Sequence, residues 1–385
     1  MKHFSHLNTA LAMLESYKGD QPFHQYIRNF FSQQKKYGAK DRRIIAQLCY
    51  GYFRAGIFLP GMSPADQLLA GLFLTIEKPV DILAALQPAW NSLIASTPAE
   101  KCRILGIDWP NFPVFPARDA ISGAIDQASF IPAHLSQPAV FLRIRPGHHH
   151  NVLKKLREKD IGFSQPSADA LQLSNAINLE SMLAINREVV VQDLSSQHTG
   201  SLLPDFANDQ PLSVYDCCAG GGGKSIMLKD RFPNAQLTLS DKRKSTLEQL
   251  HARFRQAGIS GYRALQGDAA SPSMVKPGSM DLIIADVPCT GSGTWGRTPE
   301  RLSRFQPAEI AGLVRLQQRI ITGVRPLLKP GGWLLYITCS VYSPENEEMA
   351  AFISRQPGIT LSRMEIITGY GEGADSMFGA LFRSE

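Results

Sequence analysis

Two cysteines, Cys289 and Cys339, each follow an apolar stretch that is typical of a buried strand. Residues 282–285 lead into Asp286-Val287-Pro288-Cys289, and residues 333–337 lead into Thr338-Cys339-Ser340. Because the carboxyl ends of the strands in a parallel α/β sheet form the ligand crevice, we expect both thiols to reach it. A single buried cysteine is more often an inert small hydrophobe. It is the pair, downstream of a glycine-rich loop, that indicates a catalytic site.

Two thiols and a carboxyl group at neighbouring strand ends suit covalent catalysis at carbon 5 of a cytosine ring. That carbon is a poor nucleophile, and a thiolate that adds to carbon 6 makes it enamine-like. A carboxyl group such as that of Asp286 can activate ring nitrogen 3, and a proton must later leave carbon 5 so that the thiol is eliminated. A thiol is only a few per cent thiolate near neutral pH unless nearby positive charge or a helix N-terminus lowers its pKa.

A glycine-rich loop follows another expected strand, residues 212–217, and opens a helix. The run is Asp216-Cys217-Cys218-Ala219-Gly220-Gly221-Gly222-Gly223-Lys224-Ser225. Glycines let the backbone approach a ligand closely, and the N–H groups at the start of a helix attract negative charge. The run lacks the last glycine of a dinucleotide fingerprint, and Cys218 stands where a Walker A loop has its first glycine.

Two acids follow the next expected strands. Asp241 comes roughly 20 residues after the loop, where an acid accepts hydrogen bonds from the ribose hydroxyls of a nucleoside cofactor. Asp268 follows residues 262–266 and could contact an adenine edge. From these residues alone, both a nicotinamide dinucleotide and S-adenosylmethionine remain possible cofactors.

The composition is that of an ordinary folded protein, with 44% hydrophobic and 19% charged residues among 385. This length favours two or three domains. No apolar run approaches the roughly 20 residues of a membrane span, and the N-terminus has no apolar signal core. Six cysteines without a C-x-x-C pair favour neither a disulfide framework nor a structural zinc site. We therefore expect a protein of the reducing cytoplasm, with no metal and no membrane contact.

A net charge of +6 gives modest support for a polyanionic partner such as RNA. Basic residues cluster in three places, each of which is also compatible with a solvated helix face: Lys35, Lys36, Lys40, Arg42 and Arg43; Lys242, Arg243 and Lys244; and Arg297, Arg301 and Arg304.

Apolar spacing predicts helices over most of residues 1–135. Residues 136–185 predict a small α+β unit, with a strand at 139–145, a helix at 151–159, and short strands near 171–173 and Ile177. Residues 186–385 alternate strands with helices, which is typical of a parallel sheet covered on both faces. The expected strands there are 212–217, 236–240, 262–266, 280–285 and 333–338, and a long helix over 307–328 should end before Lys329-Pro330-Gly331-Gly332.

These features together resemble the RsmB/Sun family of RNA (cytosine-5) methyltransferases, with the ribosomal RNA branch favoured. The resemblance covers residues 186–385 and rests on specific runs: Val191-Gln192-Asp193-Leu194-Ser195-Ser196-Gln197, the loop from Cys218 to Lys224, Asp286-Val287-Pro288-Cys289-Thr290-Gly291-Ser292-Gly293, Tyr336-Ile337-Thr338-Cys339-Ser340, and Pro344-Glu345-Asn346-Glu347.

The resemblance implies an α/β fold with a Rossmann-like methyltransferase domain that binds S-adenosylmethionine. It implies that Cys339 is the nucleophile, that Cys289 assists release of the covalent RNA adduct, and that Asp286 contacts the target cytosine and the cofactor side. The residues implied to hold the cofactor are Cys218, Ala219, Gly220, Gly221, Gly222, Gly223, Lys224, Asp241, Asp268 and Asp286.

The front of the chain resembles the same family more weakly. Residues 1–135 look like a helical, NusB-like RNA-binding region, and residues 136–185 look like a small RNA-recognition-like unit. Such parts would position an RNA through phosphate contacts, with the target cytosine flipped out of its stack. Trp295, beside the Cys289 loop, could stack on a base or belong to a core.

Two runs depart from the family pattern. Gly220 and Gly221 stand where the family usually has alanine and proline, so we expect a looser loop that still binds the cofactor. Arg143-Ile144-Arg145-Pro146 stands where the family tends to Arg-Val-Asn.

Other functions remain open at this stage. The substrate could be transfer RNA instead of ribosomal RNA, and the helical front favours the latter by analogy alone. The chain could also be a catalytically silent RNA-binding or ribosome-assembly factor, which the presence of both cysteines and Asp286 argues against. A small-molecule methyltransferase or NAD enzyme is a third possibility, and the basic N-terminal half argues against it.

Overall fold

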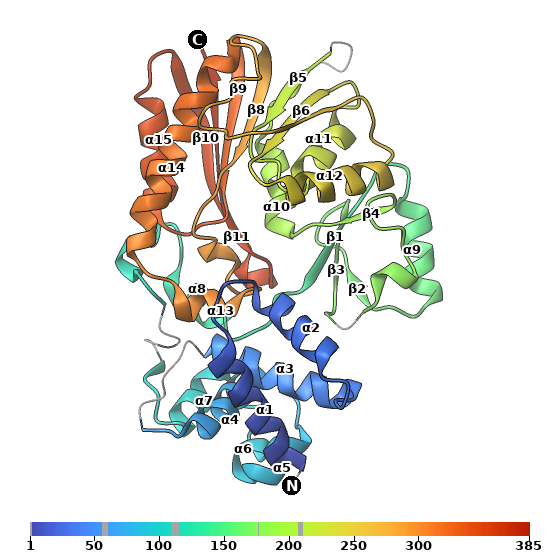
Figure 1. Cartoon of the computed structure of the whole chain (residues 1–385), viewed down its shortest axis with the longest axis vertical. Coiled ribbons are helices and arrows are strands. Elements are labelled where there is room, and N and C mark those ends of the chain that lie inside the picture. The colour runs from blue at the N-terminus through green and yellow to red at the C-terminus, as the bar shows by residue number, and fades with distance from the viewer. Residues whose placement is uncertain (1, 56–60, 110–111, 113–114, 176, 207–210) are drawn as a thin grey trace. The chain divides into compact units, whose positions relative to one another are not determined.

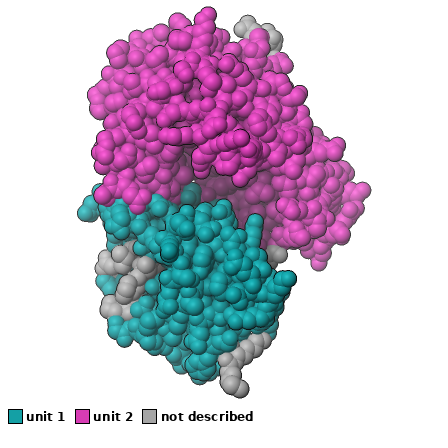
Figure 2. Space-filling model, viewed as in Figure 1, with its two compact units in different colours: residues 1–119, 126–138, 294–307 teal, residues 120–125, 139–293, 308–385 magenta. Residues whose placement is uncertain are grey.

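The structure, a computed structural model, describes residues 2–55, 61–109, 112, 115–175, 177–206 and 211–385. The chain forms two compact units, which Figure 2 distinguishes by colour. One comprises residues 1–119, 126–138 and 294–307, and the other comprises residues 120–125, 139–293 and 308–385. Each unit therefore contains a segment that is distant in sequence from the rest of it. The expected domain borders at residues 135 and 185 stay a prediction.

The first unit is helical. Its helices are α1 (Lys2–Ser16), α2 (Phe23–Gln33), α3 (Ala39–Arg54), α4 (Pro64–Thr75), α5 (Asp81–Leu86), α6 (Pro88–Ser92), α7 (Pro98–Ile104), α8 (Gln127–Ala133) and α13 (Pro299–Arg304). Helices α3 and α4 cross where Gly51 meets Gly71, and a Cβ atom on Gly71 would lie 2.7 Å from the carbonyl carbon of Gly51. The close packing of this pair depends on both glycines having no side chain.

Residues 294–307 belong to the core of the helical unit. The side chain of Trp295 is 1% exposed, and its ring lies 5.2 Å from that of Phe115 and 4.9 Å from that of Phe305. On α13, the buried Glu300 accepts a hydrogen bond of 3.0 Å from the backbone N–H of Phe23. Trp295 is therefore a core residue and not a surface on which a base could stack.

The second unit contains a small four-stranded antiparallel sheet in the order β2-β3-β1-β4. Its elements are β1 (Val140–Ile144), α9 (His149–Glu158), β2 (Phe163–Ser164), β3 (Ala170–Leu173) and β4 (Val189–Val191). The strand expected near Ile177 is wrong. Ile177 packs its side chain against the core of this sheet without pairing, and residues 189–191 pair with β1 instead.

A seven-stranded sheet in the order β10-β11-β9-β8-β5-β6-β7 forms the centre of the second unit (Figure 1). Its parallel strands are β5 (Ser213–Asp216), β6 (Gln236–Asp241), β7 (Arg263–Gln266), β8 (Met280–Asp286) and β9 (Leu328–Thr338). They are connected and flanked by α10 (Leu194–His198), α11 (Gly223–Arg231), α12 (Lys244–Gln256), α14 (Ala308–Val324) and α15 (Glu347–Ser354). The mixed α/β fold with this sheet confirms the expected fold class.

The chain leaves β5 toward β6 on one side and returns to β8 on the other, so the strand order reverses at β5. In open α/β sheets such a reversal opens a crevice at the carboxyl ends of the strands. The glycine-rich loop follows β5, and the two cysteines follow β8 and β9. The topology therefore brings the loop and both thiols to one edge.

The C-terminal part of the sheet differs from the sequence-based expectation. Residues Ile359–Thr368 (β10) and Ser376–Ser384 (β11) form an antiparallel hairpin, in which β11 also pairs with β9. Strand β9 begins at Leu328 and not near residue 333, because residues 329–332 form an irregular start of the strand where its register with β8 shifts. In the ranges given above, none of the helices is long and apolar enough to cross a membrane.

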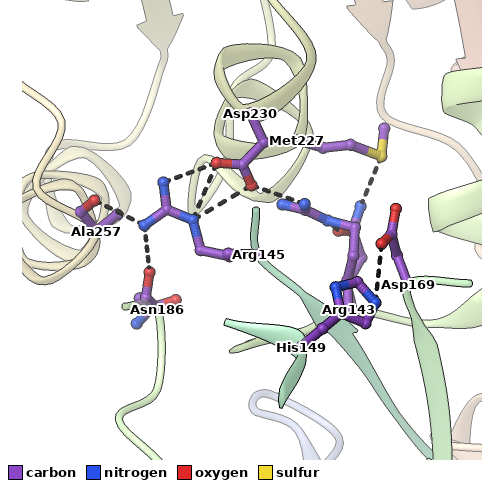
Figure 3. A network of polar contacts seen from close by, with 9 residues as sticks. Arg143, Arg145, His149, Asp169, Asn186, Met227, Asp230 and Ala257 are labelled. Atoms are coloured by element: carbon purple, nitrogen blue, oxygen red, sulfur yellow. Dashed lines mark hydrogen bonds and ion pairs between the residues drawn. The ribbon is translucent and has the colours of Figure 1, made fainter. Parts of the chain in front are cut away.

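Arg143 and Arg145, the second of which departs from the family pattern, join the small sheet to α11 (Figure 3). Arg143 and Arg145 both point at Asp230 on α11, each with a closest nitrogen–oxygen distance of 2.7 Å. Arg145 also donates to the carbonyl oxygens of Asn186 and Ala257, at 2.9 and 2.7 Å. The side chains of Asp230 and Arg143 are both buried, so the loss of one partner would leave a buried charge unpaired.

Candidate active site

The two cysteines lie against one another. Their Sγ atoms are 3.3 Å apart, and the backbone N–H of Cys339 points at the Sγ of Cys289, also at 3.3 Å. Both are free thiols and half-buried. The hydrogen bond with Cys339, together with burial, raises the pKa of Cys289 well above its ordinary value. Cys289 is thus a neutral thiol that can donate a hydrogen bond to the sulfur of Cys339.

A lysine and a carboxylate form an ion pair next to the thiols. Lys224 Nζ lies 2.6 Å from Asp286 Oδ2, and their side chains are 12% and 31% exposed. Burial lowers the pKa of Lys224, but the neighbouring Asp286 and Cys339 outweigh this effect, and the pKa is raised overall. Lys224 therefore stays positively charged beside Cys339. The sequence assigned this lysine to the cofactor loop and gave no sign of its pairing with Asp286.

The glycine-rich loop is fixed by its neighbours at several points. The N–H of Ala219 donates to the carbonyl of Ser240 at 2.9 Å. Gly220 and Gly222 have φ angles of +53° and +76°, and a Cβ atom on Gly222 would lie 2.6 Å from the ring of Phe254. The loop thus needs glycine at 222 for space and at 220 and 222 for its backbone conformation.

At Gly221, where the family usually has proline, a contact from α12 restrains the backbone. Arg253 Nη1 donates to the Gly221 carbonyl oxygen at 2.8 Å, and its Nε donates to the side chain of Asn186 at 3.1 Å. This restraint is a long-range one that the sequence did not reveal.

Asp241 and Asp268 stand at the ends of β6 and β7, as expected. Asp241 accepts hydrogen bonds from the N–H groups of Gly220 at 3.2 Å and Arg243 at 2.9 Å. Asp268 accepts from the N–H of Ala270 at 3.0 Å, and this bond together with Lys242 lowers the pKa of Asp268 despite some burial. Asp268 is therefore a carboxylate at neutral pH, beside the strand end that carries Asp241.

Asp216, at the end of β5, is a site residue that the sequence analysis did not single out. Its side chain is 2% exposed, and Oδ2 accepts a hydrogen bond of 2.5 Å from Ser225 Oγ. Its Oδ1 is buried with no hydrogen-bond partner among the described residues. Burial, reinforced by the charge of Asp286, raises the pKa of Asp216 to about 7 in spite of the bond from Ser225. The position of Asp216 directly before the glycine-rich loop was the sequence signal that could have identified it.

The predicted site residues therefore lie at the carboxyl ends of β5 to β9. Cys289 contacts Cys339, and Lys224 contacts Asp286, with Cys339 near enough to affect the pKa of Lys224. Asp241 contacts the glycine-rich loop at Gly220, and Asp268 follows the next strand. Within the part of the chain that the structure describes, no group of three or more His, Cys, Asp or Glu side chains could hold a metal ion. The arrangement suits thiol-based covalent chemistry with an organic cofactor.

Comparison with known proteins agrees with this arrangement. Residues 202–378 match the family described as 16S rRNA methyltransferase RsmB/F. The ribosomal RNA small subunit methyltransferase B of Citrobacter koseri is 28% identical over 73% of this chain and 65% of its own length. The protein of the same name from Salmonella newport is 30% identical over 60% of this chain and 55% of its own length. The chain thus spans less than two thirds of the length of these curated relatives.

Solved structures share the fold at low sequence identity. The crystal structure of PH0851 has a TM-score of 0.72 at 19% identity and covers 99% of this chain and 98% of its own. The crystal structure of NSun6 from Pyrococcus horikoshii with SFG has a TM-score of 0.59 at 14% identity and covers 67% of this chain and 94% of its own. Residues 202–378, which include both of the cysteines in contact, are thus similar to the family of RsmB/F methyltransferases.

Proposed function

We propose that this protein methylates carbon 5 of a cytosine in ribosomal RNA, with S-adenosylmethionine as the methyl donor and a covalent bond between Cys339 and carbon 6 of the base. The observation that carries the proposal is the contact between the two thiols, 3.3 Å apart, beside the Lys224–Asp286 ion pair. The names of the relatives support a small-subunit ribosomal RNA substrate. The need for free thiols supports a reducing, cytoplasmic setting.

The crevice fits S-adenosylmethionine in its donor set. Asp241 and Asp268 are carboxylate acceptors at the ends of adjacent strands, suited to ribose hydroxyls and an adenine edge. The unpartnered Oδ1 of Asp216 is a further acceptor next to the loop, and beside Gly220 an added Cβ atom would meet nothing within 4 Å. When bound there, the cofactor supplies a methyl group on a positively charged sulfur.

Different residues of this chain serve different steps of the reaction. Lys224 keeps its positive charge near the sulfur of Cys339, which attacks carbon 6. Asp286, beside Lys224, shares a proton with ring nitrogen 3 as the sulfur adds, and this proton increases the electron demand at carbon 6. After methyl transfer the proton on carbon 5 passes to water, its electron pair restores the carbon 5–carbon 6 double bond, and the sulfur of Cys339 leaves as a thiolate. Cys289 donates a hydrogen bond to that departing sulfur.

The rest of the chain would hold the RNA. We propose that the helical region of residues 1–135 and the small unit of residues 136–185 position the substrate, and that residues 186–385 carry the chemistry. The net charge of +6 supports an RNA partner. These assignments, including the NusB-like and RNA-recognition-like character, rest on resemblance and on charge.

The experiment that tests the function uses methyl-labelled S-adenosylmethionine and total RNA from cells that lack this protein. We expect label in 5-methylcytosine from small-subunit ribosomal RNA after size separation, digestion and nucleoside analysis. Label in transfer RNA would contradict the substrate and keep the chemistry. If intact cofactor binding gave no label in free RNA or in ribosome-assembly intermediates, the chain would be a silent assembly factor.

The roles of the two cysteines make different predictions. Cys339→Ala should lower methyl transfer on the order of 10³-fold or more, because the nucleophile is lost. Cys289→Ala should leave a protein–RNA adduct that survives a denaturing gel, because the departing sulfur loses its hydrogen-bond donor. An adduct in the Cys339 variant instead would reverse the assignment, and the double variant serves as the control without any adduct.

Gly221, which stands where proline is usual, predicts a substitution that strengthens cofactor binding. Gly221 does not have a positive φ, and an added Cβ would meet chiefly the flexible end of Arg253, at 3.0 Å. Gly221→Pro should therefore tighten cofactor binding roughly two- to fivefold by restricting the free loop, as measured by isothermal titration with S-adenosylmethionine. Gly220→Ala, which forces a side chain into a φ of +53°, is the matched control and should not tighten it. Saturable heat is also expected from the wild type; its absence would contradict the cofactor assignment.

Asp216 predicts a pH dependence of stability. Its folded-state pKa of about 7 lies above the unfolded value of about 3.9, so the folded state binds the proton more tightly. The associated stability is present below about pH 4 and is lost as the pH rises to 7, by at most roughly 4 kcal/mol. Urea unfolding between pH 5 and 8 should show a smaller decline for Asp216→Asn than for the wild type.

Asp268→Asn is the control for that experiment. The pKa of Asp268 is lowered, so its carboxyl group stays ionised in both folded and unfolded states across pH 5–8 and its replacement should not change the slope. Equal slopes for the wild type and Asp216→Asn would show that Asp216 does not hold its proton in the folded protein.

A further inference from the structure

A buried carboxylate lies beneath the Cys289 loop and has no role in the function proposed above. Glu345 is 0% exposed. Its side chain accepts hydrogen bonds from the backbone N–H of Thr290 at 3.0 Å, from the Thr290 hydroxyl at 2.6 Å, and from Gln317 Nε2 at 2.9 Å. Thr290 directly follows Cys289. All three donors are uncharged, so hydrogen bonds hold this carboxyl group in the core close to the thiol.

Asn346, which follows Glu345, fixes the loop that carries Cys339. Asn346 Oδ1 accepts a hydrogen bond from the Thr338 hydroxyl at 2.6 Å, and its Nδ2 donates to the Ser340 carbonyl oxygen at 2.9 Å. These two partners flank Cys339 in the sequence. The adjacent residues Glu345 and Asn346 therefore fix the residues beside each thiol, and the Thr290 and Ser340 hydroxyls, 3.1 Å apart, link the two halves.

Opposite charges lie on the two sides of the thiol pair. Lys224 lies on the Cys339 side, where that thiol contributes to its raised pKa. Glu345 lies on the Cys289 side. After the bond to Cys339 and burial, its charge is a further cause that raises the pKa of Cys289. The surroundings of the two sulfurs thus differ, and those of Cys289 favour its thiol form.

We propose that Glu345 is a positioning residue for adduct release, which holds the Cys289 loop so that the thiol of Cys289 donates to the sulfur of Cys339 as that sulfur leaves the base. This inference rests on the proposed function. In the step concerned, the carbon 5 proton passes to water, the carbon 5–carbon 6 double bond forms, and the carbon 6–sulfur bond breaks with its electron pair going to Cys339. Glu345 neither gains nor loses a proton.

The test is Glu345→Gln, which keeps the shape and removes the charge. One of its side-chain oxygens becomes an NH₂, which replaces an acceptor of the Thr290 hydroxyl or of the Gln317 amide. We expect adduct formation on small-subunit ribosomal RNA within about threefold of wild type, release slowed roughly 10- to 100-fold, and accumulated adduct on denaturing gels. Cofactor affinity should stay within about twofold. Glu348→Gln is the matched control, because it removes an exposed carboxylate three residues away, on α15.

A pH profile separates positioning from mere folding. In the wild type, release should slow at alkaline pH, where Cys289 loses its proton. In Glu345→Gln that limb should move to lower pH, because the negative charge that favours the thiol is gone. If the Gln variant does not fold, Thr290→Val removes one donor and keeps the backbone N–H, and it should show the same adduct accumulation to a smaller extent.

The wild type in the same assay distinguishes the two proposals. Wild-type protein without label or adduct would contradict the proposed function itself. Normal turnover in the wild type, with a variant that releases its adduct at the wild-type rate and with the wild-type pH limb, would overturn the role of Glu345 alone.

Discussion

The parallel pairing of β8 with β9 is the constraint on which the site depends. In this register Asp286 lies opposite Ile337, so both strands end at the same level. The loops that follow then carry Cys289 and Cys339, which are 50 residues apart in sequence, to a separation of 3.3 Å. Because a one-residue slip of a strand reverses which face its side chains occupy, the buried residues of both strands fix this register, and the register fixes the distance between the thiols.

The buried polar groups around the thiols lower the stability of the fold relative to hydrophobic side chains at the same positions. Lys224 is largely buried, and Glu345 and Asn346 are completely so. Such groups are tolerated because each is matched by hydrogen bonds or by an opposite charge. What the arrangement provides in return is specificity: two chemically identical thiols acquire different surroundings. Asp216, with an unpartnered Oδ1 and a pKa raised to about 7, is the least compensated of these groups.

The sequence predicted the parts of the site that follow from local patterns. Apolar runs located β5 to β9, and the parallel-sheet rule then placed Cys289, Cys339 and Asp241 at one edge, as the structure has them. Contacts between distant segments were not predictable in this way. Neither the Lys224–Asp286 pair nor the bond from Arg253 to Gly221 leaves a periodic signal. The β10–β11 hairpin was missed, and the strand expected near Ile177 was misplaced, because pairing partners decide which short apolar run becomes a strand.

The segment that follows the Cys289 loop in sequence belongs to the helical unit. Gly293 still belongs to the second unit, where its N–H donates to the carbonyl of Cys339 at 2.9 Å. The next fourteen residues, 294–307, belong to the helical unit and supply its core with Trp295 and Phe305. Removing the first 135 residues would therefore expose Trp295, which is now 1% exposed. It would also remove the hydrogen bond that Glu300 accepts from the N–H of Phe23. The loop that carries Cys289 therefore continues directly into residues 294–307, which are ordered by packing within the helical unit.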